Sequence, residues 1–306
     1  MKILVTGGAG FIGSNIADSY IEAEHEVVIV DNLSSGKEKN INPKAKFYQA
    51  DIQDKEALEK IFESEKPEII NHHAAQIDVR KSVTDPVFNA KVNEIGTLNL
   101  LELAVKHKTK KFILASTGGA LFGEIKEKRG AKEDHALEPI SPYAITKRAA
   151  ELYLAAYHAN YGLNYTVLRY GNVFGPRQDP HGEAGVIAIF IGKLNANESP
   201  FIYGNGRQLR DYVYVKDVCA ANLLALKKGN NKIYNVGTGI GTSVNQLFAE
   251  LKDIIGFSGK AIYKPPRAGE LFRSVLNADK IKKELKWKPQ TFVRNGLEKT
   301  VEYFKR

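Results

Sequence analysis

Short apolar runs recur along residues 1–170, and stretches with helical spacing of apolar positions separate them. The runs are rich in Val, Ile, Leu, Tyr and Phe, which favour strands. We predict strands at residues 2–6, 26–31, 46–50, 68–71, 111–116 and 165–170. Helical periodicity is clearest over residues 86–106 and 143–161. Strand followed by helix, repeated, is typical of an α/β fold with a doubly wound parallel sheet.

The pattern loosens after about residue 175 into loops rich in Pro, Gly and polar residues. It returns briefly as a helical stretch, VKDVCAANLLALKK, and an apolar run, KIYNVGTG. We therefore expect two domains. The first covers residues 1–175 and is rejoined by a segment at about 211–240, and a smaller, interleaved domain covers 176–306.

The composition is that of a globular protein with a sizeable core, because 43% of the residues are hydrophobic and 26% are charged. The opening MKILVTGG lacks a signal pattern and no apolar run reaches about 18 residues, so we expect a cytoplasmic protein without membrane contact. The net charge of +9 suits either nucleic acid or an anionic substrate. Because the lysines are scattered and not interleaved with aromatic residues, we predict no nucleic-acid binding.

A glycine-rich loop follows the first predicted strand directly. The stretch GGAGFIGS contains Gly8-x-Gly10-x-x-Gly13 and, in a second frame, Gly7-x-x-Gly10-x-x-Gly13. Glycines at this spacing permit a tight turn and let the backbone approach a pyrophosphate at the N-terminus of the next helix. Because a strand precedes the loop, a helix follows it and Asp31 ends the next strand, we predict a Rossmann-like dinucleotide site.

Acidic residues end the second and third predicted strands. Asp31 can accept hydrogen bonds from an adenosine ribose, and its charge would repel a 2′-phosphate. Only NLSSGK follows it, without an arginine, so NAD is favoured over NADP. Asp51 can bind the adenine amine while Ile52 packs on the adenine ring, although an Asp at such a position also commonly caps the next helix.

The stretch SPYAITKRAAELY predicts a helix with chemistry at its start. Ser141 can cap the free backbone amides, Pro142 suits the first turn, and Tyr143 and Lys147 share one face. Taken alone, the pair is equally compatible with an exposed helix surface. The neighbouring motifs decide between these readings.

Further motifs occur in a fixed order: NHHAAQ at 71–76, VNEIGTLNLLE at 92–102, ASTGGALFGE at 115–124 and SPYAITK at 141–147. With the glycine loop, they make the chain resemble the extended short-chain dehydrogenase/reductase family. Within it, LRYGNVFGPR, GRQLRDYVYVKDV, NVGTG and PPRAGE are similar to the UDP-glucose 4-epimerases. The resemblance implies an NAD cofactor held by Gly7, Gly10, Phe11, Ile12, Gly13, Asp31, Asn32, Asp51, Ile52, Ala74, Ala75 and Lys147.

The resemblance also implies a catalytic set. Tyr143 would be the acid/base for a sugar hydroxyl, but an unperturbed phenol has a pKa of about 10 and is a poor base at neutral pH. We expect the charge of Lys147, with that of a nearby oxidised nicotinamide, to stabilise the phenolate, and the ammonium to hold the nicotinamide ribose. Thr117 would bind the reacting oxygen, with Ser116 as a second candidate.

Two glycines, Gly118 and Gly119, follow Thr117 where related nucleotide-sugar dehydratases carry an Asp-Glu pair. The resemblance therefore favours 4-epimerisation of a UDP-hexose, by oxidation at C4 and return of the hydride to the opposite face. A related 4,6-dehydratase or a reductase of nucleotide sugars remains open. So does a protein that senses NAD without catalysis.

Substrate contacts are implied at positions that match the epimerase motifs. Two arginines suit phosphate oxygens, because each guanidinium can donate two parallel hydrogen bonds. Asn172 favours a neutral sugar, and the small side chain of Ser274 would leave room for an N-acetyl group at C2. The implied set is Ser116, Thr117, Asn172, Tyr203, Arg210, Arg267, Glu270 and Ser274.

Two further predictions concern metals and partners. The loop RQDPHGEAG carries Asp179, His181 and Glu183, but we predict no metal because closed metal sites need more convergent ligands. We assign His72 and His73 to packing and backbone hydrogen bonds. The predicted helices at 86–106 and 143–161 carry more apolar residues than one buried stripe needs, and in the resembling family such helices pair, so we expect a homodimer. The surplus residues are Leu98, Leu101, Val105, Leu152, Ala155 and Ala156.

Overall fold

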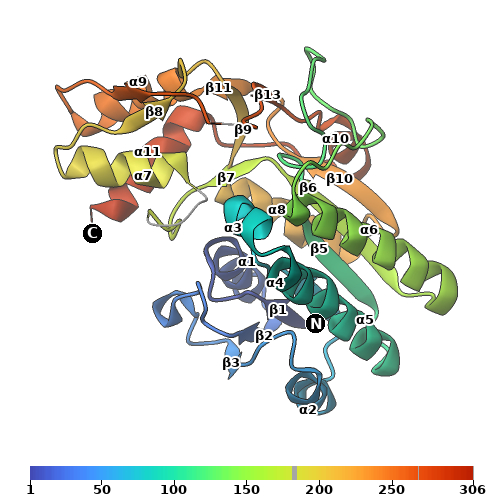
Figure 1. The fold of residues 1–306 in the computed structure, drawn as a ribbon. Helices are drawn as coiled ribbons and strands as arrows, with labels where there is room; N and C mark the ends of the chain where they lie inside the picture. Colours follow the sequence, from blue (N-terminus) through green and yellow to red (C-terminus); the bar gives the residue numbers. More distant parts are fainter. Residues whose placement is uncertain (181–184, 268, 306) are drawn as a thin grey trace.

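The computed structural model describes residues 1–180, 185–267 and 269–305, and its centre is a seven-stranded parallel sheet. The strand order is β10-β6-β5-β4-β1-β2-β3, so the predicted doubly wound α/β fold is confirmed (Figure 1). The direction of winding reverses between β1 and β4, which is where such sheets bind ligands. The strands are β1 Lys2–Thr6, β2 Glu26–Asp31, β3 Lys46–Gln49, β4 Ile69–His72, β5 Lys111–Thr117, β6 Asn164–Tyr170 and β10 Lys232–Val236.

Both faces of this sheet are buried, as expected of parallel strands. Alternation along β1 shows it: Ile3 and Val5 belong to one apolar cluster, while Leu4 belongs to another. The helices that supply the first cluster are α1 Phe11–Glu22, α8 Val215–Lys227 and α10 Asp279–Leu285. Those that supply the second are α2 Lys55–Glu65, α5 Gly96–Lys106 and α6 Pro142–Tyr161. Cys219 of α8 is a buried member of the first cluster.

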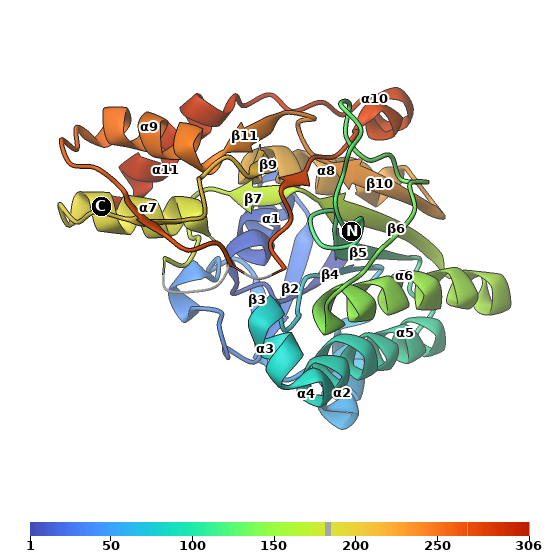
Figure 2. The same cartoon turned by 45° about the horizontal axis from the view of Figure 1, so that its top comes forward.

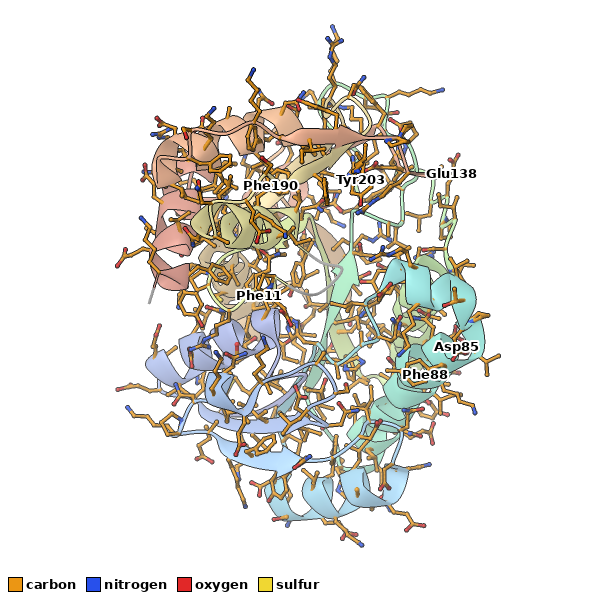
Figure 3. The ribbon with its side chains drawn as sticks, turned by 60° about the vertical axis from the view of Figure 1, so that its left-hand side comes forward. Phe11, Asp85, Phe88, Glu138, Phe190 and Tyr203 are labelled. Carbon is orange, nitrogen blue, oxygen red and sulfur yellow. The ribbon has the colours of Figure 1, made fainter. Side chains whose placement is uncertain are left out.

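The remaining elements gather beyond the carboxyl ends of the large sheet (Figure 2). A third apolar cluster joins helices α7, α9 and α11 to two small sheets. Phe11, at the start of α1, packs against this cluster and so ties the glycine-rich loop to it (Figure 3). The elements are β7 Asn172–Phe174, α7 Val186–Asn195, β8 Phe201–Tyr203, β9 Leu209–Tyr214, β11 Gly241–Ser243, α9 Val244–Ile255, β12 Ile262–Lys264, β13 Arg273–Ser274 and α11 Val293–Phe304.

The chain crosses between these two parts more than once. After β9 it returns to the large sheet, where α8 packs beside α1 and β10 pairs in parallel with β6. It then leaves again through β11 and α9. The edge strand β10 therefore lies 62 positions after the end of β6, since β6 ends at Tyr170 and β10 begins at Lys232.

The predicted helix over 86–106 is divided, which the sequence pattern did not indicate. It consists of α4 Pro86–Ala90, a π-helical segment η2 Lys91–Ile95, and α5, and a short helix α3 Val79–Thr84 precedes it. Within η2, the Asn93 amide group accepts from the Gln76 backbone at 2.8 Å and donates to Thr146 Oγ1 at 3.1 Å. Such π segments widen a helix locally and are frequent near functional sites.

Helix α6 begins and ends as its sequence predicts. The Ser141 hydroxyl accepts from the Ala144 amide at 3.2 Å, Pro142 occupies the first turn, and Gly162 ends the helix in the left-handed region at φ 72°. These local features place Tyr143 in the first helical turn. In the described part of the chain, no helix is long and apolar enough to cross a membrane.

Candidate active site

The glycine-rich loop lies at the point where the winding of the sheet reverses. Gly7 adopts a φ of +69°, and a Cβ on it would stand 2.6 Å from the backbone nitrogen of Ala74, which follows β4. A Cβ on Gly13 would stand 2.2 Å from the Gly7 carbonyl oxygen. Side chains are therefore excluded at both positions, and the N-terminus of α1 is left open to an anionic ligand.

A cavity of about 520 Å³ opens beside this loop. All the residues predicted to hold a dinucleotide line it, and so do Ser116, Thr117, Tyr143 and Asn172. The structure thus brings together segments from the ends of six strands of the large sheet, β1 to β6. The predicted dinucleotide residues on its wall are Gly7, Gly10, Phe11, Ile12, Gly13, Asp31, Asn32, Asp51, Ile52, Ala74, Ala75 and Lys147.

The two strand-end carboxylates are held by hydrogen bonds. Asp31 accepts from the backbone amides of Ala9, at 2.9 Å, and Leu33, at 2.8 Å, one on each oxygen. Each carboxylate oxygen has a further lone pair that a ribose hydroxyl can use. Burial raises the pKa of Asp51, but hydrogen bonds from Gln53 and Asn32 outweigh it, so that pKa lies below its ordinary value.

These features fit a dinucleotide with an unphosphorylated ribose. The loop excludes side chains where a pyrophosphate needs backbone, and the Asp31 side chain lines the cavity at the end of β2, where such folds bind the ribose. Lys37 also lines the cavity and was not predicted, but its ammonium lies 3.5 Å from Asp179. Other lining residues that were not predicted include Ser34, Ser35, Ile77, Asp78, Val92 and Arg177. The two serines could have been found from their place in the loop after Asp31.

Tyr143 and Lys147 lie on one face of α6, at the inner end of the cavity. The Lys147 ammonium donates to the Ala115 carbonyl oxygen of β5 at 3.0 Å. Burial lowers the pKa of Lys147 to about 8, and the negative charge of Glu151 opposes that fall. Burial also raises the pKa of Tyr143 to about 12. The expected stabilisation of the phenolate by Lys147 together with the oxidised nicotinamide concerns the NAD-bound protein and stays a prediction.

Thr117 and Ser116 differ in what their hydroxyls can do. Thr117, the last residue of β5, is half-buried on the cavity wall. Ser116 also borders the cavity, but it is buried and its hydroxyl donates to Glu151 Oε1 at 2.7 Å. Successive residues of a strand point to opposite sides, so Ser116 turns its hydroxyl into the core. The Ser116 proton is thus engaged by Glu151, and a substrate contact at Ser116 stays a prediction.

A second cavity, of about 400 Å³, is lined by Asn172, Tyr203, Arg210, Arg267 and Glu270. Asn172 lines both cavities and so marks their junction. The Arg267 guanidinium lies over the Tyr203 ring at 4.0 Å, and Arg210 lies 3.6 Å from Glu270. Tyr203, labelled in Figure 3, is the last residue of β8 in the two-stranded sheet.

The second cavity also has walls that no sequence motif indicated. They come from α7 and the strands around it, where ordinary core residues carry no distinctive pattern. Residues of this kind are Val186, Ile189, Phe190 and Phe201. Four further lining residues, Val173, Phe174, Gln208 and Tyr212, lie within the quoted motifs but were not assigned to the site.

Ser274 differs from the other predicted substrate contacts in its setting. It is buried in β13 and lines neither cavity. Its hydroxyl lies 3.5 Å from the Gly119 carbonyl oxygen. A Cβ on Gly119 would be 4.0 Å from the Ser274 hydroxyl, 3.7 Å from Asn172 and 3.9 Å from Thr117, so Ser274 adjoins these two site residues. Its place beside the sugar C2 stays a prediction.

The histidines after β4 and the rejected metal loop complete the site. His72 is buried between the hydroxyls of Thr6, at 2.6 Å, and Thr97, at 3.0 Å. His73 stacks on Tyr170 with ring centroids 6.1 Å apart, and its buried Nε2 has no hydrogen-bond partner among the described residues. The His73 backbone amide donates to the Thr6 carbonyl oxygen at 3.0 Å, so packing and a backbone hydrogen bond account for this residue as predicted.

The three acidic and histidine positions of the loop RQDPHGEAG are only partly described. Two of them, His181 and Glu183, lie outside the described residues. Among the residues that are described, no group of three or more His, Cys, Asp or Glu could hold a metal ion.

Comparison with known proteins places this geometry in context. The model of the NAD dependent epimerase/dehydratase family matches residues 3–237. The chain is similar to a UDP-glucose 4-epimerase with UDP-glucose from the hyperthermophilic eubacterium Thermotoga maritima, at 52% identity and a TM-score of 0.98, over 100% of this chain and 99% of the other. It is also similar to a UDP-glucose 4-epimerase in complex with NAD from Thermus thermophilus, at 43% identity and a TM-score of 0.96, over 100% and 99% of the two chains. A UDP-N-acetylglucosamine 4-epimerase in complex with UDP-N-acetylmuramic acid from Methanobrevibacter ruminantium has 36% identity and a TM-score of 0.93, over 99% and 98%.

Proposed function

The chain belongs to the NAD dependent epimerase/dehydratase family and is an isomerase with NAD as cofactor, and from this premise we propose that it interconverts UDP-glucose and UDP-galactose at C4. The observation that carries the proposal is the meeting of Thr117, Tyr143 and Lys147 where Asn172 joins the two cavities. A dinucleotide and a nucleotide sugar can therefore approach the same three side chains. The 52% identity to an enzyme solved with UDP-glucose supports the choice of substrate.

The chain's own residues would manage the proton. Tyr143 would exchange a proton with the C4 hydroxyl, and Thr117 would donate a hydrogen bond to the same oxygen. Lys147, held by the Ala115 carbonyl, would stabilise the phenolate that forms on Tyr143. NAD, when bound, supplies reversible two-electron redox chemistry at C4, so no external reductant is consumed.

Packing after Thr117 supports epimerisation over elimination. A Cβ on Gly118 would stand 2.5 Å from the side chain of Leu276, which is buried, so a catalytic acid at that position would have to displace the core. Gly119 contributes no acid either. The segment thus lacks the groups that would remove a second proton and expel water. A 4,6-dehydratase remains the alternative.

In the second cavity, we assign the UDP part of the substrate to the two arginines and their neighbours. Arg210 and Arg267 would bind the diphosphate, Tyr203 would lie near the uridine, and Glu270 near its ribose. In the protein alone, the Arg210 guanidinium forms an ion pair with Glu270, and the Arg267 guanidinium lies over the Tyr203 ring. UDP-N-acetylhexoses are second candidate substrates, because a relative of 36% identity is a UDP-N-acetylglucosamine 4-epimerase.

We also propose a homodimer that pairs through α5 and α6, which lie side by side (Figures 1 and 2). Exposed apolar side chains continue from α6 onto its neighbours, at Val83, Val87, Ile95, Ile145 and Leu152. Ala155 and Ala156 are exposed as well, while Leu98 and Val105 are half-buried. Leu101 is fully buried in the core of its own chain, so its inclusion in the surplus was wrong.

The decisive experiment is incubation of the purified protein with UDP-galactose and NAD, without reductant, followed by NMR of the products. We expect UDP-glucose to form until both sugars are present at equilibrium. The Tyr143→Phe variant should retain NAD and lose at least about 100-fold in turnover. Loss of water from the sugar would identify a dehydratase, and a parallel incubation with NADH in place of NAD would identify a reductase by consumption of NADH. If UDP-galactose is unchanged in both, the same test with UDP-N-acetylgalactosamine decides between the second candidate substrates and the NAD-sensing alternative.

A further inference from the structure

A buried carboxylate stands one helical turn beyond Lys147. Glu151 of α6 is 2% exposed. Its Oε1 accepts from the Ser116 hydroxyl at 2.7 Å and from Arg169 Nε at 2.8 Å. Its Oε2 accepts from Arg169 Nη2 at 2.6 Å and from Arg148 Nη1 at 3.0 Å. Four donors therefore surround the carboxylate, which satisfies its hydrogen-bonding capacity.

These bonds join the three elements that build the reaction centre. Glu151 lies on α6 with Tyr143 and Lys147, Ser116 lies on β5, and Arg169 lies on β6. Ser116 stands between Ala115, whose carbonyl receives the Lys147 ammonium, and Thr117 on the cavity wall. The bond from Ser116 to Glu151 thus fixes the end of β5 against α6.

Several titratable groups face Lys147 from the elements around it. From β4 and the residue after it come His72 and His73, which burial keeps neutral, since the pKa of His73 falls to about 3 and that of His72 lies well below its ordinary value. Tyr143, on the same helix, is protonated in the protein alone. Glu151 supplies the negative charge that acts on the ammonium.

The two arginines that bind the Glu151 carboxylate differ in how deeply they are buried. Arg169 is also buried, at 1% exposure, and its Nη1 donates to the Glu133 carbonyl at 3.1 Å. Arg148 is partly exposed, with its side chain at 33%, so water screens its charge. Loss of the Glu151 charge would therefore leave two buried cations, Arg169 and Lys147, without a buried anion beside them.

We propose that Glu151 is a positioning residue for the Tyr143–Lys147 pair: it fixes the end of β5 against α6 through Ser116, and its charge maintains the Lys147 ammonium. The inference rests on the proposed function for its kinetic consequences only. Glu151 does not reach the cavity, so it acts through Ser116 and Lys147.

The charge is tested in Glu151→Gln, which keeps the shape and removes the charge. We expect the titration of Lys147, followed by 13C NMR of its ε-carbon in full-length protein, to move down by about one pH unit. The alkaline limb of the kcat profile should move with it, while KM for UDP-galactose stays within about twofold. An unmoved Lys147 titration in the folded variant would overturn the electrostatic part.

A matched control separates this effect from general destabilisation. Glu65 is also a buried carboxylate paired with lysines, but it lies at the opposite edge of the sheet. Glu65→Gln should lower the melting temperature without moving the Lys147 titration or the alkaline limb. If both variants move the alkaline limb equally, stability alone explains the result and the inference is wrong.

The geometric part is tested in Ser116→Ala, which leaves both arginines paired and the Glu151 charge in place. We expect kcat to fall about tenfold with an unchanged alkaline limb, because the end of β5 is no longer held. A wild-type kcat in Ser116→Ala would overturn the geometric part of the proposal. If Glu151→Gln does not fold, the kcat of Ser116→Ala alone tests the proposal. The Lys147 titration needs no substrate, so a protein that fails to epimerise UDP-galactose would refute the proposed function and still test Glu151.

Discussion

Glu65 offers a prediction whose size follows from the structure. It is the last residue of α2 and is 5% exposed, beneath the amino ends of β1 and β3. Its carboxylate accepts from Lys46, from the Tyr48 hydroxyl at 2.5 Å and from Lys2 at 3.2 Å. Burial raises the pKa of this carboxyl, but the three hydrogen bonds outweigh it and lower the pKa from 4.5 to about 2.

The lowered pKa sets the free energy and its sign. A fall from 4.5 to about 2 corresponds to about 3 kcal/mol of stability at neutral pH. The Lys46 side chain is 58% exposed, so solvent screening reduces the expected value to about 1–2 kcal/mol. Because the folded-state pKa is lowered, this stability is present above about pH 4.5 and is lost as the pH falls towards 2.

The assay compares urea unfolding of wild type and Glu65→Gln at several pH values. At pH 7 the variant should be less stable by about 1–2 kcal/mol. The difference should shrink below about pH 4.5, because the wild-type carboxyl in the unfolded chain then takes up a proton. A difference that is the same at pH 7 and pH 3.5 would show that the loss comes from packing, and the electrostatic reasoning would be refuted.

Three further variants test the site and the proposed dimer. Gly13→Ala should weaken NADH binding at least about tenfold in a fluorescence titration, because the new Cβ would meet the Gly7 carbonyl oxygen at 2.2 Å. The control variant Gly192→Ala should bind NADH as wild type does, because its Cβ would make only ordinary van der Waals contact. Ser274→Tyr should lower kcat/KM for UDP-galactose and UDP-N-acetylgalactosamine alike, since Ser274 is buried, lines neither cavity, and overpacking costs about 1–3 kcal/mol; selective loss of the N-acetyl substrate would show instead that Ser274 borders the C2 substituent. Leu152→Arg should give the monomer mass in light scattering, and an unchanged dimer mass would exclude this helix face.

Local chemistry made part of this molecule predictable from sequence. The start of α6 could be predicted because Ser141 and Pro142 act within one turn of the residues they position. The grouping of Asp31 and Asp51 at one cavity followed from strand direction, because parallel strands end at the same edge. The glycine loop could be recognised because backbone approach requires the same residue wherever it occurs.

Other features depend on contacts that no local pattern records. The π segment η2 keeps apolar spacing close to that of an α-helix, and its cause lies in bonds from Asn93 to distant residues. Which of Ser116 and Thr117 faces the cavity depends on how β5 packs against Glu151. The raised pKa of Tyr143 depends on how deeply the folded chain buries its ring. The burial of Ser274 depends on the two-residue pairing of β13 with β9.

The late return of β10 to the sheet has a consequence for synthesis on the ribosome. β6 ends at Tyr170, but its partner strand is complete only at Val236, 66 residues later. At about 5–20 residues per second, that interval lasts about 3–13 s. During it the nascent sheet has an open edge at β6, whose unpaired amides and carbonyls are a template for pairing with another chain. The interval ends when β10 emerges and covers β6, so the C-terminal half of the chain completes a sheet that the N-terminal half began.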